Sequence, residues 1–342
     1  MALTLKDIAK MVGVAESTVS RAINNKSGVG EDTRKEILRI VEKYNYKPNQ
    51  MARGLAKQET RILALIVSDL SIQSHLQIIN KVEEIANNEG YQVILCNTRN
   101  SSAREKDYLN LLERNQVDGG IIVGSKLTDE NIINTSLRGD NILVLINRLT
   151  EELLIPTVLI DKVEGAYLAV KHLLEQGLQR IAIVMGDYNS YEESEKLAGY
   201  KNALNDYGLE YDESYVIAAS GKKSDGHNAF MRAVDLPQPP RSFFVTNELM
   251  TAGLIESIKM GGYLIPEDFA IVCYGESILT SVIEPSLTVV AEPLDKMGEI
   301  AAEYLIKLIN EDSLSAMIKV LKPELKINDS STPQIINKKR ED

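Results

Sequence analysis

The sequence predicts two unlike parts: a small all-α headpiece at the N-terminus and a larger α/β body of two doubly wound, parallel-sheet subdomains. Residues 4–24 carry apolar side chains at helical spacing on either side of a glycine turn, and a third helical pattern follows. From residue 61 onward, short apolar runs alternate with helical patterns instead. The 342-residue chain is long enough for two or three domains with ample cores.

The first two helices are predicted over residues 5–11 and from about residue 15 onward, with the corner at Gly13. Glycine adopts the positive φ that a sharp turn needs. In the second helix Val19 and Ala22 point inward at i, i+3, so that its polar side chains remain on the other faces. A helix with a small, polar first half can approach base edges in the major groove, where Arg21 can bind guanine with two hydrogen bonds.

A third helix is predicted within residues 29–46, with Asp32 or Thr33 as its N-cap. Its expected apolar stripe consists of Ile37, Ile40, Val41 and Tyr44. Pro48 ends this region, and Asn49 can cap a short helix over residues 50–56. A helix of about seven residues is too short to persist alone, so we expect it to fold only when paired on DNA.

The segment TLKDIAKMVGVAESTVSRAINN, the third helix and YKPNQMARGLA closely resemble the headpiece of the LacI/GalR family of bacterial transcription repressors. The resemblance is nearly continuous over residues 3–57 and looser over residues 61–327. It implies a lacI-type helix-turn-helix headpiece (1–57) with a hinge helix at 49–56. It also implies a periplasmic-binding-protein-like body that binds an effector and dimerises: subdomain one covers 61–160 and 292–322, subdomain two covers 161–291 and 323–327, and 328–342 form a tail.

The expected DNA-binding residues follow from the helices and the resemblance: Thr4, Leu5, Glu16, Ser17, Thr18, Ser20, Arg21, Asn24, Asn49, Ala52 and Leu55. Ser17 and Arg21, with Glu16 and Thr18, are expected to read bases. Thr4, Ser20 and Asn24, which flank these residues, are expected to contact phosphates. The resemblance places Leu55 in the minor groove as a wedge that bends the duplex. Alternatively, Leu55 is one exposed apolar residue in a linker.

The charge distribution agrees with DNA binding at one end of the chain. Residues 1–60 hold 11 Lys+Arg and 7 Asp+Glu, a balance of +4, whereas the whole chain carries −11, which leaves −15 for the other 282 residues. A basic headpiece on an acidic body confines the attraction for phosphates to the headpiece. A balance of +4 could by itself arise by chance.

The body shows the alternation that parallel sheets require. Apolar runs stand at 62–67, 92–96, 119–123, 142–146, 157–160, 180–184, 242–246 and 270–273, with helix patterns at 76–88, 105–115, 165–176, 193–207, 225–234 and 248–260. About 260 residues are too many for one such sheet, which indicates two subdomains. In α/β sheets ligands bind at the carboxyl ends of the strands, so a cleft between the subdomains is expected.

The resemblance gives the candidate effector-binding residues: Ser74, His75, Arg148, Lys196, Asn247 and Glu276. Lys196 stands where the family often has an effector-binding Arg, and Gly275 where it often has an Asp, which leaves Glu276 to reach in. The cations Arg148 and Lys196, with His75, suit an anionic ligand such as a sugar phosphate or sugar acid. Lys196 could instead be a solvated helix charge, or the cleft could bind no small molecule and answer to a protein partner.

Catalysis, metals and cofactors are not expected, because no nucleophile elbow, Walker A loop, HExxH or dinucleotide fingerprint occurs. His172 looks like a helix-packing residue. Cys96 and Cys273 lie in apolar runs and read as buried strand cysteines in a reducing cytoplasm. No 18-residue apolar run and no signal-peptide core occur, so we expect a cytoplasmic protein with no membrane partner.

These observations predict a sequence-specific transcriptional regulator, a repressor of carbohydrate-related genes that binds a palindromic operator as a homodimer and responds to a small effector. A transport-type binding protein and a structural DNA-binding protein whose body only dimerises are the alternatives. Residues 1–57 and the missing signal peptide argue against the first alternative. The tail has no leucine heptads, so a tetramer held by a coiled coil is not expected.

Overall fold

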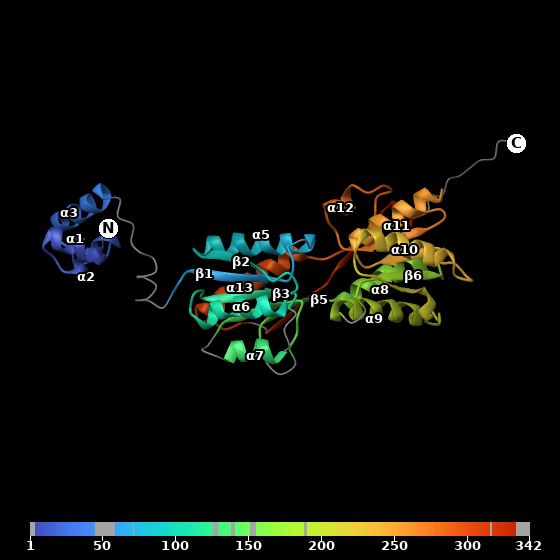
Figure 1. The fold of residues 1–342 in the computed structure, drawn as a ribbon, viewed down its shortest axis with the longest axis horizontal. Helices are drawn as coiled ribbons and strands as arrows, with labels where there is room; N and C mark the ends of the chain where they lie inside the picture. The colour runs from blue at the N-terminus through green and yellow to red at the C-terminus, as the bar shows by residue number, and fades with distance from the viewer. Residues whose placement is uncertain are drawn as a thin grey trace. The chain divides into compact units, whose positions relative to one another are not determined.

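The computed structural model describes residues 4–44, 59–70, 72–125, 129–137, 141–150, 155–187, 190–314 and 317–332, without the side chains of residues 73, 129–131 and 137. The chain forms two compact units, residues 1–61 and 62–342 (Figure 1). Among the described residues, none of the helices combines the length and apolarity needed to cross a bilayer. The predicted fold class, an all-α headpiece followed by two parallel-sheet α/β subdomains, is confirmed.

The headpiece consists of α1 (Leu5–Val12), α2 (Glu16–Ile23) and α3 (Glu31–Lys43). Gly13 ends α1 in the left-handed region with φ 74°, as the turn prediction requires. Its core consists of Ile8, Ala9, Val19, Ala22 and Ile37, one small cluster shared by all three helices.

Two details of α3 differ from the prediction. Gly30, and neither Asp32 nor Thr33, is the N-cap, so Asp32 lies in the first turn, where a carboxylate favours the helix dipole. Tyr44 is 50% exposed instead of completing the apolar stripe. It follows the last helical residue, and the Lys43 ammonium lies 5.3 Å from its ring centroid.

The first sheet of the body has six parallel strands in the order β11-β5-β4-β3-β1-β2. They are β11 (Ile318–Leu321), β5 (Thr157–Ile160), β4 (Leu143–Ile146), β3 (Gly119–Val123), β1 (Ile62–Val67) and β2 (Gln92–Asn97). Alternate residues of β1 face opposite cores. One core contains α5 (Gln73–Asn88) and α13 (Leu294–Ile309), and the other contains α6 (Ser102–Glu113) and α7 (Asp129–Leu137).

The second sheet has the order β12-β10-β9-β8-β6-β7. Its strands are β12 (Glu324–Lys326), β10 (Thr288–Ala291), β9 (Ala270–Tyr274), β8 (Ser242–Val245), β6 (Ile181–Met185) and β7 (Val216–Ala218). One face packs on α8 (Lys162–Glu175) and α9 (Tyr191–Asp206), the other on α10 (Lys223–Val234) and α11 (Glu248–Met260). The short helix α12 (Ile278–Ser281) follows β9. The edge strand β12 runs antiparallel to β10. The prediction of a parallel sheet is therefore wrong for this one strand.

The chain crosses between the sheets three times. It passes from β5 to α8, returns from β10 to α13, and passes again from β11 to β12. The first two crossings bring residues 161–162 and residues 292–293 to the carboxyl ends of strands, where a ligand cleft is expected.

The packing of α8 on α9 depends on Gly199. A Cβ atom at this position would lie 2.2 Å from the carbonyl oxygen of Val163 and 2.9 Å from the backbone nitrogen of Tyr167. These are backbone atoms, so the helices would have to move apart to admit even a methyl group.

We therefore expect Gly199→Ala to lower the free energy of unfolding of the body by about 2 kcal/mol or more. Asn202→Ala, on the exposed face of the same helix, should change it by less than about 0.5 kcal/mol. Urea unfolding followed by circular dichroism measures both values. Equal stability of the two variants would show that the helices can separate at no cost.

Candidate functional site

The predicted recognition helix α2 presents its polar side chains outward. Val19 and Ala22 are buried in the headpiece core, whereas Glu16, Ser17 and Arg21 are exposed. Thr18 and Ser20 are half-buried at its sides. The exposed face has small side chains at its first turn and an arginine one turn later, the composition that a major-groove reader needs.

Three of the other expected DNA contacts also have roles in the fold. The Thr4 hydroxyl accepts from the Asp7 backbone N–H at 3.2 Å and the Asp7 carboxylate accepts from the Thr4 backbone N–H at 3.0 Å, which forms a capping box for α1. The Thr4 hydroxyl also donates to the Asp7 carboxylate at 2.6 Å. These hydrogen bonds lower the pKa of Asp7. Leu5 packs partly buried against the core, and the Asn24 amide donates to the Ser20 carbonyl at 2.8 Å. Asn49, Ala52 and Leu55 lie outside the described residues.

Arg34, which the sequence reasoning missed, ties α3 to the end of α2. Its guanidinium donates to the Asn25 side chain at 2.8 Å, the Ala22 carbonyl at 3.3 Å and the Lys26 carbonyl at 2.5 Å. It therefore fixes the loop after the recognition helix. No local pattern marks it, because each of its partners lies eight or more residues away.

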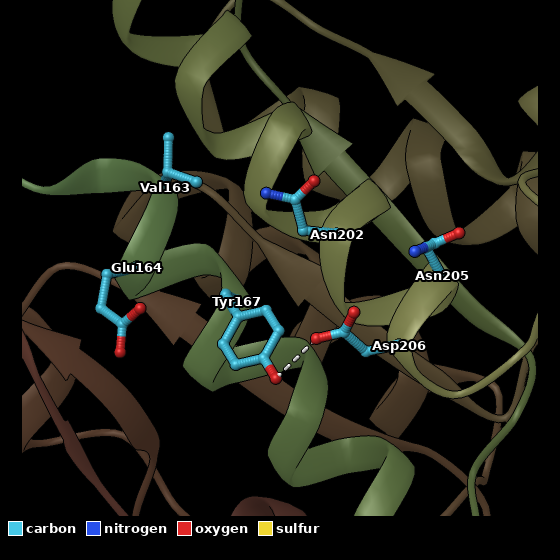
Figure 2. Close-up of a pocket in the computed structure, with 6 residues that line it drawn as sticks. All are labelled: Val163, Glu164, Tyr167, Asn202, Asn205 and Asp206. Atoms are coloured by element: carbon cyan, nitrogen blue, oxygen red, sulfur yellow. Dashed lines mark hydrogen bonds between the residues drawn. The ribbon is translucent and has the colours of Figure 1, made fainter.

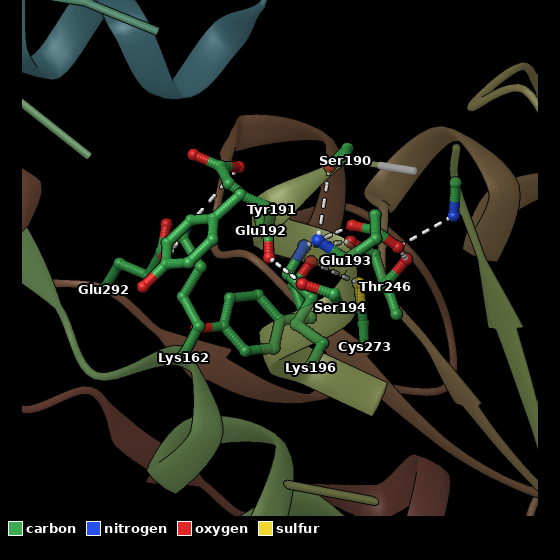
Figure 3. Close-up of polar contacts among 12 residues, drawn as sticks. Lys162, Ser190, Tyr191, Glu192, Glu193, Ser194, Lys196, Thr246, Cys273 and Glu292 are labelled. Carbon is green, nitrogen blue, oxygen red and sulfur yellow. Dashed lines mark hydrogen bonds and ion pairs between the residues drawn. The ribbon is translucent and has the colours of Figure 1, made fainter. Parts of the chain in front are cut away.

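A buried polar network lies at the carboxyl edge of the second sheet (Figure 3). Lys196 on α9 is 6% exposed and donates to Glu193 at 2.8 Å and to the Thr246 carbonyl at 3.2 Å. Glu193 in turn accepts from the Thr246 hydroxyl at 2.6 Å and from the Gly186 backbone N–H at 2.8 Å. Lys196 is thus not a solvated helix charge, because it is buried and paired with Glu193.

Lys162 and Glu292 form a second buried pair next to this network. The Lys162 ammonium lies 2.9 Å from Glu292 and 3.7 Å from the half-buried Glu192. The Tyr274 ring lies between the lysines: its centroid is 4.5 Å from the Lys196 ammonium and 5.8 Å from that of Lys162. No sequence motif marks Lys162 or Glu292, although Glu292 directly follows β10 and Lys162 lies two residues after β5.

The pKa values of the network reflect burial opposed by these pairings. Burial acts to raise the pKa of Glu292 and of Glu193, but the attraction of Lys162 and Lys196 respectively outweighs it, so both values are lowered. Burial would lower the pKa of Lys162, but Glu192 and Glu292 raise it well above its usual value. Burial raises the pKa of Tyr274. At neutral pH Lys162 is therefore cationic, and Glu193 and Glu292 are anionic.

The other effector candidates lie in varied surroundings. His75 is buried, its Nδ1 lies 2.8 Å from the Asp69 carbonyl oxygen, and burial lowers its pKa. Ser74 is half-buried beside it, and Arg148 is half-buried after β4. Asn247 is the N-cap of α11 and accepts from the Met250 N–H at 3.1 Å. Glu276 is an exposed side chain paired with Lys326 at 2.6 Å, so it does not reach in where Gly275 lacks a side chain.

Two hollows lie near these elements. One of about 160 Å³ lies at the first crossing; it is lined by Asn147, Leu159, Ile160, Asp161, Lys162, Tyr191, Glu195 and Val320. The other, about 270 Å³, is a groove between α8 and α9 in which Tyr167 donates to Asp206 at 3.0 Å (Figure 2). Residues of both subdomains line the first hollow, as they would line an effector site between the subdomains.

Known proteins share this organisation. Residues 4–49 match bacterial regulatory proteins of the lacI family, and residues 170–331 match a periplasmic binding protein-like domain. The HTH-type transcriptional regulator RegA of Clostridium saccharobutylicum is 30% identical over 328 residues, 95% of this chain and 98% of its own length. This chain belongs to the lacI family. It is a DNA-binding transcriptional regulator, as the headpiece predicts.

Solved structures of lacI-family regulators have the same fold. A complex of the transcriptional regulator CelR with cellobiose matches with a TM-score of 0.71 and 27% identity, over 96% of this chain and 99% of that one. The lac repressor dimer bound to operator and an anti-inducer matches with a TM-score of 0.85 and 22% identity, over 97% and 100% of the two chains. The latter likeness concerns the fold alone.

We expect Lys162→Met to lower the free energy of unfolding of the body by about 3–5 kcal/mol, because it leaves Glu292 buried without its partner. The pKa of Glu292 should then rise above its unfolded value, so the deficit should grow as pH rises from about 5 to about 8. Urea unfolding of the variant and the parent at each pH measures this.

Two controls distinguish the loss of the pair from the loss of a lysine. Lys162→Met combined with Glu292→Leu should recover most of the stability, because no unpaired charge remains. Lys171→Met breaks an exposed pair with Glu175, 3.8 Å apart, and should change the stability by less than about 1 kcal/mol. A deficit in Lys162→Met that is independent of pH would contradict the assignment.

Proposed function

We propose that this regulator is a cytoplasmic repressor of carbohydrate-related genes, which binds a near-palindromic operator as a homodimer and responds to a small polar effector in the cleft. The observation that carries the proposal is the surface of α2, where Ser17 and Arg21 are exposed on a helix that the headpiece core holds by Val19 and Ala22. The +4 charge of residues 1–60 adds a general attraction for phosphates.

A homodimer is supported by apolar side chains exposed on the body. Ile278 and Val282, one helical turn apart at α12, are 75% and 71% exposed, and Leu249 at the start of α11 is 49% exposed. Exposed apolar side chains this large favour a protein interface. A two-fold dimer matches a palindromic operator. The lac repressor neighbour is described as a dimer bound to operator.

Control by an effector is supported by the two-sheet architecture and by the hollow at the crossing. We propose that a ligand there changes the angle between the subdomains and thereby the pairing of hinge helices at residues 49–56, with Leu55 as the minor-groove wedge. Coupling of this kind is reciprocal, so operator DNA would change ligand affinity by the same factor.

A second candidate, control by a protein partner, is favoured by the neutralisation of Lys162 and Lys196 within the chain itself. The CelR relative is described as a cellobiose complex, which favours a small molecule instead. Thermal-shift screening separates the two, because a ligand at about 100 times its Kd adds about 2.7 kcal/mol of stability.

Arg21→Ala is the test of DNA reading. A bidentate arginine discriminates between bases by roughly 1–3 kcal/mol, so its loss should flatten the sequence preference in a binding-site selection. Arg39→Ala removes the same charge from an exposed site on α3 and should weaken binding without changing the preference. An unchanged selection profile for Arg21→Ala would mean that other residues read the operator.

Combining Ile278→Glu with Val282→Glu is the test of assembly. Two carboxylates on this surface cannot be buried in an interface without partners, so the variant should be monomeric at micromolar concentration by light scattering. Met260→Glu, at a side chain that is 81% exposed on α11, should remain dimeric. A stable dimer in the double variant would place the interface elsewhere, and a tetrameric parent would contradict the proposed assembly.

A further inference from the structure

The loop that joins α11 to β9 exposes three large apolar side chains at the amino-terminal end of the parallel strands of the second sheet. Met260 ends α11, and Tyr263 and Leu264 follow it; they are 81%, 43% and 61% exposed. The Leu264 N–H donates to the Asp268 carboxylate at 2.8 Å, and the Tyr263 ring packs edge-on against Phe269, with 5.2 Å between centroids. These three side chains, the loop patch, therefore stand together on a loop that its own contacts hold in place.

The last described residues of the chain lie at the same end of this sheet. Ser330, in the short 3-10 helix η2 (Asp329–Ser331), is fully buried. Its hydroxyl donates to the Ile271 carbonyl at 2.7 Å, and its backbone N–H donates to the Ser286 carbonyl at 2.9 Å. Ile271 is the second residue of β9, two positions after Phe269, and Ser286 comes two residues before β10. The chain is thus held next to the loop patch just before its final ten residues.

The sequence of these ten residues, which lie outside the described region, suits the loop patch. Residues 333–342 read PQIINKKRED, so two adjacent isoleucines, Ile335 and Ile336, are followed by a basic run at 338–340. An extended chain spans about 3.3 Å per residue, so the isoleucines can lie about 10–13 Å from Thr332. The two positions from Ile271 back to Phe269 cover at most about 7 Å, which is well within that reach.

The charges near the loop patch agree with the basic run of this segment. They include three carboxylates and two cations: Glu267, Asp268, Glu284, Lys259 and Arg241. The Lys259 ammonium donates to the Glu284 carbonyl, which brings that residue to the end of α11. Exposed ion pairs each contribute little, so these charges orient the segment, whereas the apolar contacts supply most of its affinity.

We propose that the loop patch is the docking surface for residues 333–342 of the same chain, with Ile335 and Ile336 packed against Tyr263 and Leu264. The tether favours this occupant over a second copy, because a segment joined by a few residues has an effective concentration of the order of millimolar. The docked segment covers exposed apolar surface. It closes the amino-terminal end of the second sheet, opposite to the strand ends where a ligand cleft is expected.

Disulfide trapping in the full-length chain tests this docking. Leu264→Cys combined with Ile336→Cys should form a disulfide within one chain on mild oxidation, because the two Cα atoms must come within about 7 Å. Tyr207→Cys with Ile336→Cys is the matched control: Tyr207 is exposed at the same end of the sheet, after α9 on the other face. The first pair should react at least about tenfold faster, measured by peptide mass spectrometry. The native Cys96 and Cys273 are buried.

Hydrogen exchange gives a second measurement that needs no cross-link. Ile335→Ser combined with Ile336→Ser should speed exchange of the Tyr263 and Leu264 amides by about tenfold, because the docked segment no longer shields the loop. Gln334→Ser with Asn337→Ser makes two substitutions beside the isoleucines and should leave the exchange unchanged.

The results that overturn the proposal are distinct from these. Equal rates for the two cysteine pairs would mean that the segment does not prefer the loop patch. A disulfide that joins two chains would mean that the loop patch accepts a second copy instead. Unchanged exchange in the isoleucine variant would also contradict the proposal, and circular dichroism checks that each variant is folded.

Discussion

The ion pair between Lys162 and Glu292 is the interaction on which the arrangement of the body depends. The two residues are 130 positions apart in the sequence and lie at two of the three crossings between the sheets. Removing an ammonium and a carboxylate from water is unfavourable unless each has the other as a partner. Any arrangement of the crossings that separates them leaves a buried charge alone, so the pair selects one geometry of the junction more than it adds net stability.

The same constraint applies to the buried polar network at the carboxyl edge of the second sheet. Lys196 and Glu193 form a second buried ion pair at this edge. The Thr246 hydroxyl and the Gly186 N–H also donate hydrogen bonds to the Glu193 carboxylate. Each lysine thus neutralises a carboxylate of its own chain.

The headpiece depends on shorter-range interactions. Its core is five buried side chains, which is small for a folding unit, and the capping box of α1 and the loop contacts of Arg34 supplement it. Along α2, the helical period places the residues that pack in the core on one face and the exposed polar residues on the other. Val19 and Ala22 hold the helix, and Ser17 and Arg21 remain exposed. The function of the headpiece is therefore set by the same periodicity that sets its fold.

The sequence alone determined what depends on near neighbours. It gave the turn at Gly13, the buried side of α2, and the alternation of strands and helices that makes a doubly wound body, because periodicity and turn chemistry act within a few residues. Only the tertiary structure decided the antiparallel pairing of β12, the partners of Lys162 and Lys196, and the place of Glu248 beside Gly275. A charged side chain looks the same in the sequence whether it faces water, a ligand or another charge of its own chain. Its partner is chosen by residues that are distant in sequence and become neighbours only when the sheets and their crossings have formed.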